Sequence, residues 1–126
     1  MKKFFCFFIL TLSLALYACN NNEVKFEIIS TFAEVSPNES TNRVYTIFVP
    51  DFSDDIILWE KMEEFAIEQE YSDNAMTIVY FFSDKMNTPD VTYIGNDFDP
   101  KYEQYCVAGF WRYATGETKF NQYPFK

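Results

Sequence analysis

The sequence has 126 residues with 10 basic and 19 acidic side chains, so its formal net charge at pH 7 is −9. This charge argues against nucleic acid as a partner, because the phosphates of nucleic acids are held by Lys and Arg. The sequence contains no histidine, which removes Ser-His-Asp and Cys-His catalysis and the usual zinc sites built from His and Cys.

The first 22 residues have the character of an export signal followed by a short polar stretch. Lys2 and Lys3 precede an uncharged, mostly apolar run over residues 4–18, and three asparagines follow at 20–22. A helix needs about 20 apolar residues to cross a bilayer, and this run has 15. Its length and basic start therefore favour a secretory signal.

The end of this run, Leu16-Tyr17-Ala18-Cys19, resembles the lipobox of bacterial lipoproteins. That family has an aliphatic residue three positions before the cysteine and a small residue directly before it. Tyr17 is larger than the residue usual at its position. The resemblance implies cleavage after Ala18 and attachment of diacylglycerol to the Cys19 thiol. It covers the first 19 residues and carries no implication for the fold of the mature domain.

We therefore expect a signal peptide at 1–18, a lipidated tether at 19–23 and a single domain at 24–126. Loss of Lys2 and Lys3 with the signal takes the net charge from −9 to −11. Two or more acyl chains hold a protein firmly on a membrane that it does not cross. The expected place is the cell envelope, facing the periplasm or the cell exterior. A plain signal peptide with a free cysteine, or a retained signal anchor, remains the alternative.

Five stretches beyond the tether have the pattern of strands, and the first is 24–34, where apolar and charged residues alternate. The second, 43–49, is rich in β-branched and aromatic residues and ends at Pro50. Residues 75–82 are apolar at nearly every position, which is typical of a central strand covered on both sides. Strands are also expected at 105–113 and 117–123, with Thr115-Gly116 as a hairpin turn. A short sixth strand is expected at 91–94.

One helix is expected between the second and third strands. Ser53 or Asp54 is the expected N-cap, and the helix would run to about Glu70. An apolar stripe formed by Leu58, Met62, Phe65 and Ala66, flanked by Trp59, would lie on a sheet. A helix in this place predicts that the strands on either side of it are parallel neighbours.

The expected fold class is α+β: one amphipathic helix packed on a mixed sheet of about five or six strands, with a C-terminal antiparallel meander. The expected core consists of Val44, Ile47, Val49, Leu58, Met62, Phe65, Ile78, Tyr80, Phe82, Val107 and Phe110.

The most suggestive candidate for binding is an aromatic face formed by Trp111, Tyr113 and Tyr105. In a strand with strict alternation, these three residues share one face with Val107 and Gly109. The opposite face would then carry Cys106, Ala108 and Phe110. If the tryptophan face is exposed, it is a platform for a sugar or a partner protein. Otherwise these rings close the core or cover a second small layer.

Two clusters of carboxylates have structural explanations beside chemical ones. Asn96-Asp97-Phe98-Asp99, with Glu103 nearby, has oxygen ligands suited to a hard cation, but its spacing fails the EF-hand and fits an Asx turn. Asp51, Asp54 and Asp55 fit helix capping as well as acid–base work. Cys106 is expected in the core, and no disulfide is expected because the signal removes Cys6 and lipid occupies Cys19. No cofactor, metal site or catalytic residue is predicted.

These observations predict a membrane-tethered extracytoplasmic lipoprotein that acts as a non-enzymatic binding or interaction module. Its acidic charge suits a basic protein or a neutral glycan as partner. The first alternative is a small carboxylate-dependent hydrolase acting on envelope glycans, which would need two carboxylates about 5 to 10 Å apart. A second alternative is a structural subunit of an envelope assembly.

Overall fold

The computed structural model describes residues 23–91 and 98–126. Its elements, in chain order, are β1 (Glu27–Val35), β2 (Thr41–Phe48), α2 (Ile56–Ile67), β3 (Thr77–Phe82), the 3-10 helix η1 (Pro100–Tyr105), β4 (Cys106–Arg112) and β5 (Thr118–Gln122). The lipidation candidate Cys19 lies outside the described residues, as do Asn96 and Asp97 of the cation candidate.

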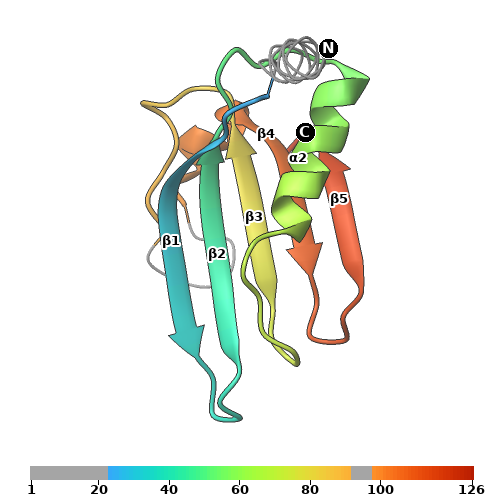
Figure 1. Cartoon of the computed structure of the whole chain (residues 1–126). Helices are drawn as coiled ribbons and strands as arrows, with labels where there is room; N and C mark the ends of the chain where they lie inside the picture. The colour runs from blue at the N-terminus through green and yellow to red at the C-terminus, as the bar shows by residue number, and fades with distance from the viewer. Residues whose placement is uncertain (1–22, 92–97) are drawn as a thin grey trace, which may run out of the picture.

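The five strands form one mixed sheet in the order β1-β2-β3-β4-β5 (Figure 1). β2 and β3 are parallel, and α2 connects them, as the sequence predicts. β1 is antiparallel to β2, and β3, β4 and β5 are each antiparallel to the next. A mixed sheet with an α-helix and a short 3-10 helix has the expected α+β class.

The helix α2 covers one face of the sheet over β3, β4 and β5 (Figure 1). It buries Leu58, Trp59, Met62 and Ala66 against the sheet. The core on this face, called here the helix-side cluster, consists of Tyr45, Ile47, Val49, Leu58, Trp59, Met62, Ala66, Val79, Phe81, Val107, Ala108 and Phe110. Burial of these side chains is the main force that holds the helix on the sheet.

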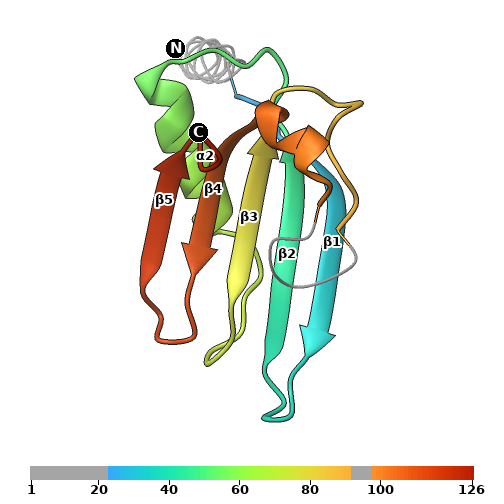
Figure 2. The same cartoon turned by 180° about the vertical axis from the view of Figure 1, so that it is seen from behind.

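On the opposite face of the sheet, η1 lies over one end of the strands (Figure 2), and the end of the segment 83–91 is bonded to β1 and β2. The second cluster lies here and consists of Val44, Ile78, Tyr80, Phe82, Val91, Phe98 and Cys106. The Thr46 hydroxyl donates to the carbonyl of Pro89 at 2.8 Å, and the Val91 amide donates to the Ser30 hydroxyl at 3.1 Å. These bonds anchor the loop to β1 and β2. On β3, Ile78, Tyr80 and Phe82 are covered by the other members of the second cluster, so β3 is buried on both faces.

All the residues predicted for the core are buried except Phe65, which is partly exposed and packs against the helix-side cluster. A short strand was predicted at 91–94. Val91, its first residue, is buried but belongs to no strand. The rest of that stretch lies outside the described residues.

Both ends of the helix differ from the prediction. The N-cap is Asp55, whose side chain accepts from the Ile57 amide at 2.7 Å, and the expected Asp54 instead accepts from the Trp59 indole at 2.7 Å. The helix ends at Ile67, before the predicted Glu70. Arg112 of β4 donates to the Ile67 carbonyl at 3.2 Å. This bond satisfies one of the backbone carbonyls that the end of a helix leaves without a partner.

The predicted faces of β4 are wrong at its beginning. Phe81 pairs with Ala108, whereas Phe82 pairs with Cys106, so one extra residue, Val107, stands in β4 as a bulge. As a result Val107 joins Ala108 in the helix-side cluster, and Cys106 joins the second cluster. Strict alternation holds only beyond this bulge.

Candidate binding site

The three aromatic residues proposed as a binding face lie in two places. Trp111 and Tyr105 pack against the second cluster, opposite the helix. The Trp111 ring meets the Tyr80 ring edge-on, with 5.9 Å between their centres, and both Trp111 and Tyr105 stay partly exposed. Tyr113 lies just beyond β4 and lines a separate pocket. The first two rings therefore cover a second small layer, which was the alternative reading of this face.

The pocket that holds Tyr113 lies between the turn that joins β4 to β5 and the segment that joins α2 to β3. We call it the hairpin pocket. Its volume is about 400 Å³, and its lining consists of Tyr71, Ser72, Asp73, Asn74, Arg112, Tyr113, Ala114, Thr115 and Gly116. This lining combines two phenol rings with hydroxyl, amide, carboxylate and guanidinium groups, so the pocket offers both flat apolar surface and hydrogen-bonding groups.

Arg112 and Tyr71 form one wall of the hairpin pocket. The guanidinium carbon of Arg112 lies 3.8 Å from the centre of the Tyr71 ring, a cation–π contact. The same guanidinium donates to the carbonyl of Ile67 at 3.2 Å. These two contacts hold the side chain of Arg112 from β4 against the end of α2, and the wall is built before any ligand arrives.

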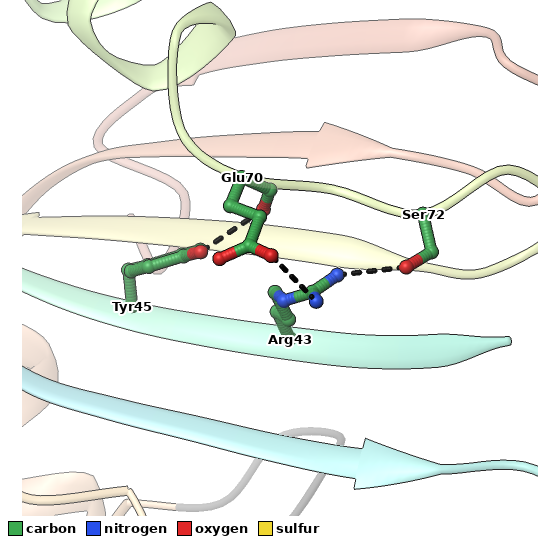
Figure 3. Close-up of polar contacts among 4 residues, drawn as sticks. All are labelled: Arg43, Tyr45, Glu70 and Ser72. Atoms are coloured by element: carbon green, nitrogen blue, oxygen red, sulfur yellow. Dashed lines mark hydrogen bonds and ion pairs between the residues drawn. The ribbon is translucent and has the colours of Figure 1, made fainter.

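A second arginine fixes the segment that carries Tyr71 (Figure 3). Arg43 donates to the Ser72 hydroxyl at 2.8 Å and to a Glu70 carboxylate oxygen at 3.2 Å. The Tyr45 hydroxyl donates to the Glu70 carbonyl at 2.9 Å. Glu70 and Ser72 flank Tyr71, so two side chains of β2 hold the chain on both sides of the pocket's aromatic residue.

The environment of Tyr45 follows from this placement. Its burial raises the pKa of the phenol above the usual 10.0, the positive charge of Arg43 opposes this shift, and Glu70 adds to it. The Arg43 side chain is 14% exposed, whereas that of Glu70 is 78% exposed. The Arg43–Ser72 bond is therefore the better protected half of the network.

Comparison of this chain with protein-family models, with curated proteins and with solved structures gives no match.

Two of the three carboxylates that precede α2, those of Asp54 and Asp55, have structural partners. Asp55 caps the helix and Asp54 accepts from the Trp59 indole, while Asp51 adopts a left-handed backbone with φ 52°. Asp99 likewise accepts from the Lys101 amide at 3.0 Å and caps η1. In the part of the chain that the structure describes, no group of three or more Cys, Asp or Glu side chains is placed to hold a metal ion.

Cys106 is buried beneath the loop layer, with its sulfur 3.4 Å from the Ala108 carbonyl oxygen. Burial raises the pKa of its thiol to about 12, although hydrogen bonding to the Ala108 backbone acts in the opposite direction. A protonated, buried thiol is a poor nucleophile. Its place supports the prediction that it is a core residue.

Sequence reasoning missed Tyr71, Arg112 and Arg43 as residues of a site. Tyr71 directly follows the predicted end of the helix, and the two arginines lie within the predicted strands 43–49 and 105–113. Their contacts join positions 41 and 29 apart along the chain. No local pattern encodes such distances. The signal that the sequence does carry is Tyr113, a residue of the predicted aromatic face, which lines the pocket.

Proposed function

We propose that this chain is a membrane-tethered extracytoplasmic lipoprotein whose domain binds a ligand, without chemistry, in the hairpin pocket. The observation that carries the binding role is the prebuilt wall of Tyr71 and Arg112, together with Tyr113. A site fixed by contacts within the protein loses little conformational freedom on binding, which favours affinity.

The tether rests on the lipobox-like sequence that ends at Cys19. Among the described residues no helix is long and apolar enough to cross a membrane. The starts of β1 and α2 lie at one end of the sheet, and the β4–β5 turn lies at the other (Figure 1). A chain anchored through its N-terminus therefore points the hairpin pocket away from the lipid. The cell envelope, facing the periplasm or exterior, is the proposed place.

Two finer features of the fold belong to this proposal. We treat α2 as an amphipathic helix, because it buries Leu58, Met62 and Ala66 and turns its acidic residues outward. We also treat the last three strands as an antiparallel meander. In this arrangement β4 and β5 form a hairpin, and the turn of that hairpin lines the pocket.

The ligand class that fits best is a neutral saccharide. Flat phenol rings such as those of Tyr71 and Tyr113 suit the apolar faces of a sugar, and the polar lining suits its hydroxyls. The mature net charge and Asp73 in the lining disfavour an acidic ligand. A hydrolase acting on glycans is the less supported alternative, because Asp54 and Asp55 are engaged in holding α2.

Calorimetric titration of the processed protein in neutral detergent, with a panel of neutral oligosaccharides of glucose, mannose, galactose and N-acetylglucosamine, tests the binding role. We expect one member to bind, Tyr71→Ala to abolish that binding, and Tyr71→Phe to retain most of it. Val35→Ala is the control, because Val35 is an exposed apolar residue outside the pocket. Absence of binding across the panel, or equal binding by Tyr71→Ala, would refute the proposal.

The lipid anchor has its own test. Mass spectrometry of the processed protein should show an acylated N-terminal Cys19, and Cys19→Ala should leave the chain unprocessed. Detection of an unmodified Cys19, or of residues 4–18 still attached, would contradict the tether.

A further inference from the structure

We propose that the end of the domain at which α2 begins rests on the lipid surface, with the side chains of Ile56 and Ile57 inserted among the headgroups. This inference rests on the proposed lipidation of Cys19. The two isoleucines are the first residues of α2 and are 73% and 59% exposed. Both side chains are large and apolar, and packing within the domain does not account for their exposure.

The chain enters the domain beside these isoleucines. Glu23 and Val24, the first described residues, line one hollow together with Ile57; its volume is about 510 Å³. Val24 and Phe26 pack against the helix-side cluster, and the Phe26 ring lies 4.9 Å from that of Phe65. The chain is therefore fixed to the domain from this point onward and offers no slack beyond it.

The short distance along the chain from Cys19 to Glu23 keeps this end of the domain near the membrane. Four residues span at most about 14 Å even when fully extended, and the acylated cysteine sits at the headgroup layer. Whatever conformation these residues adopt, Ile56 and Ile57 stay within reach of the lipid. Tethering at such a short range raises the effective concentration of the two surfaces, so even a weak apolar contact is populated.

The charged side chains around the isoleucines determine whether an anionic or a neutral lipid surface is favoured. Glu23, Asp51 and Asp55 line the hollow beside Ile57, together with Lys25 and Lys61. An acidic excess is repelled by anionic headgroups. The partner is therefore a zwitterionic, neutral phospholipid surface, and anionic lipid should weaken the contact.

The test uses the full, acylated protein reconstituted in phosphatidylcholine vesicles. Ile57→Cys carries a polarity-sensitive fluorophore, and Ile56→Cys is a second site in case the first disturbs folding. Val35→Cys is the control because it is also exposed, at 69%, and ends β1 at the far end of the sheet. Cys106 is buried and does not compete for the label.

We expect the label at 57 or 56 to shift its emission to the blue and to lose intensity when nitroxide-bearing lipid is added, while the label at 35 does neither. Replacing a third of the lipid with phosphatidylglycerol should reduce both effects. Equal, water-like emission at all three sites on an acylated protein would overturn this inference alone. Stronger quenching with phosphatidylglycerol would overturn the neutral surface. Failure to find acylated Cys19 would instead overturn the proposed tether and this inference with it.

Discussion

The indole ring of Trp111 lies directly over Gly109, two residues earlier in β4. A Cβ atom at position 109 would stand 2.4 Å from Cη2 and 2.8 Å from Cζ3 of that ring. Real Cβ contacts are longer than this, so the glycine is what allows the ring to lie so close to the strand and to meet Tyr80.

Gly109→Ala should therefore destabilise the protein. The added methyl group must push away a rigid ring that packs on the second cluster, and overpacking of this kind costs about 1–3 kcal/mol in free energy of unfolding. Urea denaturation followed by circular dichroism measures it. In a Trp111→Leu background the same substitution should cost much less, because the ring is gone. An equal cost in both backgrounds would show that the ring is not the cause.

Asp55→Ala should lower the free energy of unfolding by about 1 kcal/mol, because the Ile57 amide loses its acceptor at the start of α2. Asp55→Asn keeps an acceptor oxygen and should cost far less. Glu60→Ala, an exposed substitution within α2, is the control and should change stability little. Thermal denaturation of the three variants checks the order, and a large loss in the Asn variant would contradict the capping role.

The regular elements were predictable because their signal is local. The parallel pairing of β2 and β3 follows from an apolar strand on each side of one helix, and the residues of these strands carry that pattern in sequence. Burial of Val44, Ile47 and Ile78 follows for the same reason. Short-range periodicity is enough to place such side chains.

The features that escaped prediction depend on contacts between distant residues. The end of α2 is satisfied by Arg112, which stands 45 residues away. The bulge at Val107 arises from pairing with Phe81 and Phe82 on another strand and leaves no mark in the sequence of β4. The hairpin pocket has the same origin, because Tyr71 meets Arg112 only after the sheet has formed. For this reason the aromatic face expected from alternation was divided between the second cluster and the pocket.

The three residues Arg43, Tyr45 and Glu70 should contribute unequally to the free energy of unfolding. Tyr45→Phe removes the hydroxyl that bonds the Glu70 carbonyl and should cost about 1 kcal/mol in free energy of unfolding. Glu70→Gln should cost less than about 0.5 kcal/mol, because an ion pair with so exposed a carboxylate contributes little. Arg43→Met should cost more than either, since it leaves the Ser72 hydroxyl without its donor. Urea denaturation of each variant measures these costs, and equal losses from Glu70→Gln and Arg43→Met would refute this order.

Cys106 should make stability depend on pH above about 9. Burial raises the pKa of its thiol from 9.0 to about 12 in the folded protein, so between these values the folded chain keeps a proton that the unfolded chain has lost. The thiol's stabilising contribution is complete below pH 9 and is lost as the pH rises toward 12, at up to about 1.4 kcal/mol per pH unit.

Urea midpoints of the wild type and Cys106→Ala at pH 8, 9 and 10 measure the effect. Other groups, including Tyr45, titrate in both proteins and cancel in the difference, so the variant should lose less stability than the wild type over this range. Parallel declines in the two proteins would mean that the thiol ionises as readily in the folded state as in the unfolded one.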